Sequence, residues 1–162
     1  MAVVLVGPMG AGKTTLGKKL AKKLGLSFAD TDRLIAKDHG PITKIFEKRG
    51  EDHFRGLETQ YLKAAVNDYQ IVATGGGIVL SEQNREILSL HTVIFLDTDQ
   101  QSVIGKINLD KRPLLAKNPE AWGEIYEARL PLYKAVANHT VFTGNRPIRV
   151  VTKELEEIIV GN

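Results

Sequence analysis

The 162-residue sequence contains no cysteine, no long hydrophobic run and no cluster of basic residues. Without cysteine the chain cannot form a disulfide or use a thiolate nucleophile, and the redox state of its compartment stays open. The apolar run Val3–Val6 is too short for a secretory signal, and no stretch approaches the length of a membrane span. Lysines and arginines never exceed two in succession, which argues against a dedicated nucleic-acid or membrane surface. We therefore expect a cytoplasmic protein without nucleic-acid or membrane partners.

The composition is typical of a globular protein that folds as one unit. Hydrophobic residues make up 43% of the chain and charged residues 25%, which is enough apolar surface for a core. The net charge of +3 is modest and suits an enzyme that handles anions. Since no repeat, low-complexity tract or linker is found, we expect a single domain over residues 1–162. The short chain, without an exposed apolar stripe, indicates a monomer.

A complete Walker A phosphate loop begins directly after the apolar run Val3–Val6. It reads Gly7-Pro8-Met9-Gly10-Ala11-Gly12-Lys13-Thr14. Glycines let backbone N–H groups close around phosphate oxygens, and the helix that follows directs its N-terminal dipole at the same phosphates. Lys13 is placed to reach the β- and γ-phosphates of ATP, and the Thr14 hydroxyl to hold Mg²⁺. The residues expected to bind ATP here are Gly10, Ala11, Gly12, Lys13, Thr14 and Thr15.

Short β-branched runs alternate with helical segments along the chain, which predicts a three-layer α/β fold around a mainly parallel sheet. The predicted strands are Val3–Val6, Ser27–Ala29, Ile71–Ala73, Thr92–Leu96 and Thr140–Phe142. The predicted helices are Lys13–Leu24, Arg33–His39, Ile42–Asn67 with a break near Gly50, Glu82–Leu88, Gln100–Ile107, Pro119–Val136 and Ile148–Val160. Two segments with little apolar periodicity, Asp38–Arg55 and Asp110–Trp122, are candidates for flaps over a ligand site at the carboxyl edge of the sheet.

Asp30 and Asp32 stand at the end of the predicted second strand. Alternate residues of a strand share a face, so both carboxylates are expected to point into one pocket. One carboxylate then serves Mg²⁺ through its waters, and the other takes a hydroxyl proton from an acceptor. The alternative is that one of them only caps the following helix.

Other classes of phosphate-loop protein lack support in the sequence. The base-reading motif of GTPases and the signature loop of ABC ATPases are both absent, which argues against these two classes.

Arginines and glycines supply the other candidate site residues. Arg55 precedes Glu58 by one helical turn, which indicates either an exposed ion pair or an anion-binding guanidinium oriented by the carboxylate. The glycines Gly75, Gly76 and Gly77 end the third strand, where their entropic cost favours close approach of a ligand over a simple turn. Arg112 lies near the start of the second flap and Arg129 follows its end, and together they suit a second anionic ligand.

Together these motifs resemble the shikimate kinase family across nearly the whole chain. The segments that carry the resemblance are GPMGAGKT, ADTD, HFRGLE, TGGG, KRPLL and ARLPLY, in the family's order. The resemblance implies transfer of the γ-phosphoryl group of ATP to the 3-hydroxyl of shikimate, in aromatic amino-acid biosynthesis. It also implies the nucleoside monophosphate kinase fold, with a five-stranded parallel sheet in the order 2-3-1-4-5. The substrate-binding region then falls at residues 31–60 and a lid at residues 110–122.

The resemblance also assigns roles to single residues. Asp30 supports the metal through water beside Thr14, and Asp32 binds the ring hydroxyls of shikimate as the candidate base. Arg55 and Arg129 bind the substrate carboxylate, because the planar guanidinium group matches the planar geometry of a carboxylate. The glycines of the triplet, Gly76 above all, contact the substrate through the backbone.

Arg112 resembles the lid arginine that closes on the phosphates, and Arg146 is expected near the adenine. The family often has an arginine stacked on adenine where this chain has Gly105 beside Lys106. Adenine packing therefore stays open.

Two other functions compete with this interpretation. A related small-molecule kinase with a neutral polyol acceptor would not need the arginine pair, and one with a nucleotide acceptor would need a base pocket that the sequence does not indicate. A non-catalytic ATP-binding module would be expected to have lost Asp32 or Lys13, and both are present.

Overall fold

The strands form a single parallel sheet. A computed structural model describes residues 1–104 and 120–161 of the chain. Within them, five strands pair in the order β2-β3-β1-β4-β5, which confirms the expected topology. Their bounds are Val3–Val6 for β1, Phe28–Asp30 for β2, Ile71–Ala73 for β3, Thr92–Asp97 for β4 and His139–Phe142 for β5.

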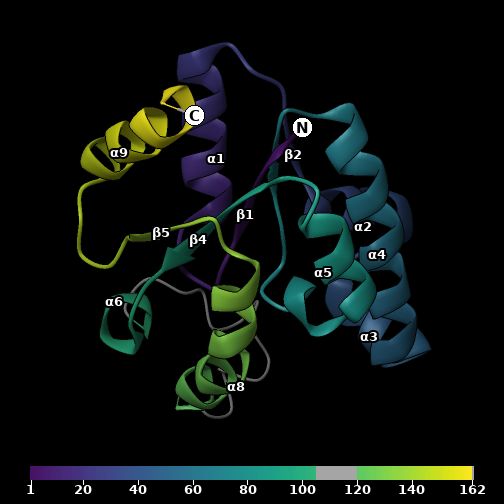
Figure 1. Ribbon diagram of the computed structural model, residues 1–162. Coiled ribbons are helices and arrows are strands. Elements are labelled where there is room, and N and C mark those ends of the chain that lie inside the picture. Colours follow the sequence, from purple (N-terminus) through teal and green to yellow (C-terminus); the bar gives the residue numbers. More distant parts are fainter. Residues whose placement is uncertain (105–119, 162) are drawn as a thin grey trace.

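Helices cover both faces of this sheet (Figure 1). One face carries α1 (Lys13–Leu24) and α9 (Ile148–Val160). The other side holds α2 (Thr31–His39), α3 (Ile42–Arg49), α4 (Glu51–Asp68), α5 (Glu82–Leu88) and α8 (Ala121–Val136). A 3₁₀ turn, η1 (Ile78–Leu80), follows β3, and α6 (Gln100–Ile104) follows β4.

The core lies in two layers because successive side chains of a strand point to opposite faces. On β1, Val4 and Val6 pack with Leu62 of α4 and Phe95 of β4 in the layer under α4 and α8. Leu5 points the other way, into a layer that includes Leu16, Leu20 and Leu155 from α1 and α9. A strand that is buried on both faces appears in the sequence as a continuous apolar run, so the positions of such strands could be predicted well.

The boundaries differ from the prediction mainly around the second strand. The strand extends to Asp30, and α2 starts at once with Thr31, because the Asp30 side chain accepts a hydrogen bond from the Arg33 N–H at 3.2 Å and so caps the helix. The break expected near Gly50 is present, since Gly50 has φ 85° between α3 and α4. Most of Asp38–Arg55 is therefore helix.

Helix α8 begins at Ala121, two residues after the predicted start. Of the predicted lid, residues 110–119 lie outside the described part of the chain. In the described residues, no helix is both long and apolar enough to cross a membrane.

Candidate active site

The phosphate loop joins the carboxyl end of β1 to the start of α1. Gly10 and Gly12 have φ of 84° and 92°, a region that disfavours side chains, so the loop needs glycine at both positions. The Lys13 ammonium donates hydrogen bonds to the carbonyl of Gly7 and, at 3.1 Å, to that of Pro8. The cation therefore lies over the loop, where phosphate groups bind in proteins of this kind.

Two side chains from distant elements hold the same loop. The Trp122 indole at the start of α8 donates a 2.8 Å hydrogen bond to the carbonyl of Met9. The Thr143 hydroxyl, after β5, donates one of 2.8 Å to the carbonyl of Ala11. Neither contact could be inferred from the sequence, because both partners are more than a hundred residues away along the chain.

Asp30 caps the following helix, which is one of the two alternatives that the sequence left open. One carboxylate oxygen caps α2, and the other accepts a hydrogen bond from the Thr14 hydroxyl. The geometric reason given for Asp32 is wrong, however. Because the strand ends at Asp30, Asp32 lies in the first turn of α2 and not on the strand. It still reaches the same pocket, since α2 begins at the carboxyl edge of the sheet.

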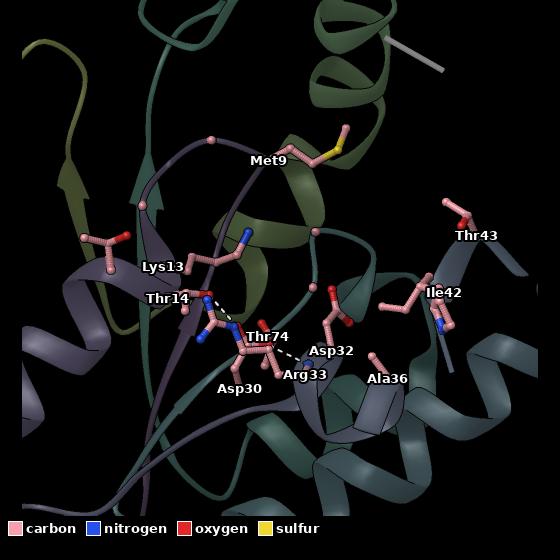
Figure 2. A pocket seen from close by; sticks show the side chains of 16 residues that line it. Met9, Lys13, Thr14, Asp30, Asp32, Arg33, Ala36, Ile42, Thr43 and Thr74 are labelled. Atoms are coloured by element: carbon pink, nitrogen blue, oxygen red, sulfur yellow. Dashed lines mark hydrogen bonds between the residues drawn. The ribbon is translucent and has the colours of Figure 1, made fainter. Parts of the chain in front are cut away.

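These residues surround a cavity of about 930 Å³, which is in the range of small-ligand sites. Figure 2 shows Lys13 on one side and the Asp32 carboxylate on the other, with both charged groups directed into the space between them. The other lining residues come from the phosphate loop, β2 and α2, the start of α3 and the end of β3: Met9, Gly10, Gly12, Thr14, Thr15, Asp30, Arg33, Ala36, Pro41, Ile42, Thr43, Thr74, Gly75 and Gly76.

The glycine triplet is approached closely by side chains of the protein itself. A methyl group added at Gly75 would lie 2.7 Å from a carboxylate oxygen of Asp32. One added at Gly77 would lie 2.2 Å from Nη1 of Arg55. None of the three glycines has a positive φ. At positions 75 and 77, glycine therefore leaves room for the side chains of Asp32 and Arg55, which occupy the space that a Cβ would fill.

The guanidinium of Arg55 is part of a charged cluster beside this loop. Its Nη1 donates a 2.7 Å hydrogen bond to Glu58, whose side chain is 1% exposed, and its Nε bonds to Glu51 at 3.2 Å. Burial raises the pKa of Glu58, while the charges of Arg55 and then Arg129 act in the opposite direction. Arg129, from α8, thus adds a second cation to the cluster. This pair of cations can receive an anionic group.

Tyr133 is a neighbour of the site that the sequence analysis did not select. Its hydroxyl donates a 2.5 Å hydrogen bond to the carbonyl of Gly76, and the side chain is fully buried. The sequence did contain a signal for Tyr133. Arg129 and Tyr133 are one turn apart on a predicted helix, so the two side chains share a face.

Arg146 and Arg112 are two further predicted ATP contacts. Arg146 donates to Glu154 of α9 at 2.7 Å and to the carbonyl of Phe142 at 2.6 Å, and it does not line the cavity. Arg112, together with Gly105 and Lys106, lies outside the described residues.

Comparison with known proteins identifies the family of this chain. The family model for shikimate kinase matches residues 9–159. The curated shikimate kinase of Salinispora arenicola is 41% identical over 162 residues, covering 98% of this chain and 97% of that protein. The one from Streptomyces coelicolor is 40% identical over 155 residues, covering 93% of this chain and 91% of that protein. Among solved structures, a shikimate kinase from Acinetobacter baumannii in complex with shikimate superposes with a TM-score of 0.93 at 38% identity, covering 99% of this chain and 93% of that chain. The chain belongs to the shikimate kinase family.

Proposed function

We propose that the cavity between the phosphate loop and α2 is where this chain transfers the γ-phosphoryl group of ATP to the 3-hydroxyl of shikimate. As a member of the shikimate kinase family, the chain is an ATP-dependent enzyme that phosphorylates shikimate in aromatic amino-acid biosynthesis. The observation that carries the proposed site is that Lys13 and Asp32 face each other across one cavity. In phosphoryl transfer to an alcohol, a cation can stabilise the charge on the phosphates, and a carboxylate can orient the acceptor hydroxyl or take its proton.

ATP is assigned to the phosphate loop side of the cavity. Backbone N–H groups of Gly10–Thr15 would surround its phosphates, with Lys13 balancing their charge. Thr14 and Asp30 are the proposed holders of Mg²⁺. Their oxygens meet in a hydrogen bond beside the loop, and hydroxyl and carboxylate oxygens are the ligands that this cation prefers. When bound, the metal would neutralise charge on the phosphates during transfer.

Within the described residues, no three acidic, histidine or cysteine side chains gather into a ready-made metal site. This suits a magnesium ion that is held mainly by ATP phosphates and water, with few protein ligands.

Shikimate is assigned to the α2 side. Asp32 would orient the acceptor hydroxyl and take its proton, either as a true base or only as the group that positions the hydroxyl, since a loose transition state needs little base help. Arg55 and Arg129 would bind the carboxylate. A neutral polyol would not require such a pair, whereas a carboxylate matches two planar guanidinium groups well. Gly75, Gly76 and Gly77 would meet the substrate through the backbone.

The assay is phosphorylation of a panel of acceptors by the purified protein with ATP and Mg²⁺. Shikimate should be the preferred acceptor, and gluconate and nucleoside monophosphates should react poorly. Preference for either of those would refute the proposal. As part of it we also expect a cytoplasmic monomer without nucleic-acid or membrane partners, and sedimentation of the purified chain tests the monomer.

A further inference from the structure

Tyr133 of α8 is a buried polar residue that the proposed function leaves without a role. Its side chain is fully buried, and its ring stacks on Phe95 of β4 with 5.1 Å between the centroids. Packing alone accounts for the ring, and phenylalanine would pack equally well. The hydroxyl needs a separate explanation, because a buried hydroxyl costs free energy unless it is hydrogen-bonded.

The hydroxyl bonds to the glycine loop and lies near Arg129, the arginine proposed to bind the substrate carboxylate. It donates to the carbonyl of Gly76 at 2.5 Å. Burial raises the pKa of Tyr133 to about 12, while the charge of Arg129 and a hydrogen bond from that guanidinium act in the opposite direction. The phenol is therefore protonated at neutral pH. One hydroxyl can then donate its proton to Gly76 and accept from Arg129 at the same time.

Gly76 lies near the Tyr133 hydroxyl, the Arg129 guanidinium and the phosphate loop. A methyl group added there would lie 3.4 Å from Nη1 of Arg129, 3.7 Å from the Tyr133 hydroxyl and 3.7 Å from the carbonyl oxygen of Gly7. That carbonyl also accepts a hydrogen bond from Lys13. The Gly76 peptide, whose carbonyl Tyr133 binds, therefore lies close to both halves of the proposed site.

We propose that Tyr133 is a positioning residue for the acceptor. Its hydroxyl fixes the Gly76 carbonyl and the Arg129 guanidinium relative to each other, so that the backbone of the glycine loop and one carboxylate-binding cation present a single rigid surface. This rests on the proposed function, in which Arg129 binds the shikimate carboxylate. It predicts an effect on shikimate that ATP does not share.

The test is Tyr133→Phe, which removes one oxygen and keeps the ring. We expect the KM for shikimate to rise about 5- to 30-fold, the range that follows from losing one or two hydrogen bonds. The KM for ATP and kcat should stay within about twofold. A shikimate analogue without the carboxylate should lose less affinity than shikimate, because it no longer depends on Arg129.

Tyr69→Phe is the matched control. Tyr69 lies just before β3, at the opposite end of the sheet from the glycine loop, and packs against the same core layer as Tyr133. Both KM values should be unchanged in this variant. An unaltered shikimate KM in Tyr133→Phe would overturn the inference alone. So would equal rises for both substrates. A wild-type protein that does not phosphorylate shikimate would overturn the proposed function itself.

If Tyr133→Phe does not fold, the wild-type chain provides a second test. Its four tyrosines are replaced by 3-fluorotyrosine. The ¹⁹F signal of Tyr133 is then assigned by elimination, from the three single phenylalanine variants at Tyr61, Tyr69 and Tyr126. Shikimate should shift this signal, and the analogue without a carboxylate should shift it much less. A signal that shikimate does not move would overturn the proposal.

Discussion

Substitution of Gly77 by alanine tests whether the glycine loop exists to make room for Arg55. The new methyl carbon would lie 2.2 Å from Nη1, whereas ordinary contact begins near 3.4 Å, so the nitrogen must withdraw by about 1 Å. The same nitrogen holds Glu58 at 2.7 Å, and this bond cannot survive such a movement unchanged. Misplacement by 1 Å can cost about 100-fold in a positioned site. We therefore expect the KM for shikimate to rise about 10- to 100-fold.

Initial rates with one substrate varied at saturating levels of the other give both KM values. The KM for ATP should change little in Gly77→Ala, because the phosphate loop is untouched. The backbone itself accepts alanine, since Gly77 has φ −95° and ψ 7°. Gly56→Ala is the matched control: it lies beside Arg55 in α4, and an added methyl meets nothing within 4 Å. That variant should keep wild-type kinetics and gain about 0.5–1 kcal/mol in unfolding free energy. A normal shikimate KM in Gly77→Ala would refute the steric argument.

Three further substitutions separate the proposed roles. Asp32→Asn should lower turnover about 10²- to 10⁴-fold with ATP affinity near normal, as measured by single-turnover kinetics, and nearly full activity would end its assignment as base. Arg129→Lys keeps the charge but loses the planar fork, so shikimate binding should weaken while ATP binding, followed by calorimetry, stays constant. Equal loss for both ligands would indicate a general structural defect. Asp30→Asn should raise the Mg²⁺ concentration needed for half-maximal activity, and an unchanged magnesium titration would contradict its metal role.

The local features of this protein could be predicted because their causes are local. The phosphate loop is recognisable since glycines at fixed spacing and Lys13 follow a buried strand, all within a few residues. Strand and helix positions followed from apolar periodicity and from breaks such as Gly50. The error at Asp32 arose when a local rule was applied to the wrong type of secondary structure. Alternation along a strand was applied to a residue that belongs to a helix, because the Asp30 cap starts α2 immediately.

The shape of the substrate side was decided by tertiary structure alone. Sheet order pairs β2 with β3 and sets Asp30 opposite Ala73, which places the start of α2 beside the glycine loop and brings Asp32 close to Gly75. Nothing in the order of residues along the chain states that pairing.

The same holds for the contacts of Arg55 with Gly77 and of Tyr133 with Gly76, which join helices α4 and α8 to the end of β3. The sequence by itself determined which chemical groups the site contains, since motifs specify residue types. Only the fold determined that Asp32 and Arg55 lie in the space beside Gly75 and Gly77, because such proximity depends on atoms brought together from distant parts of the chain.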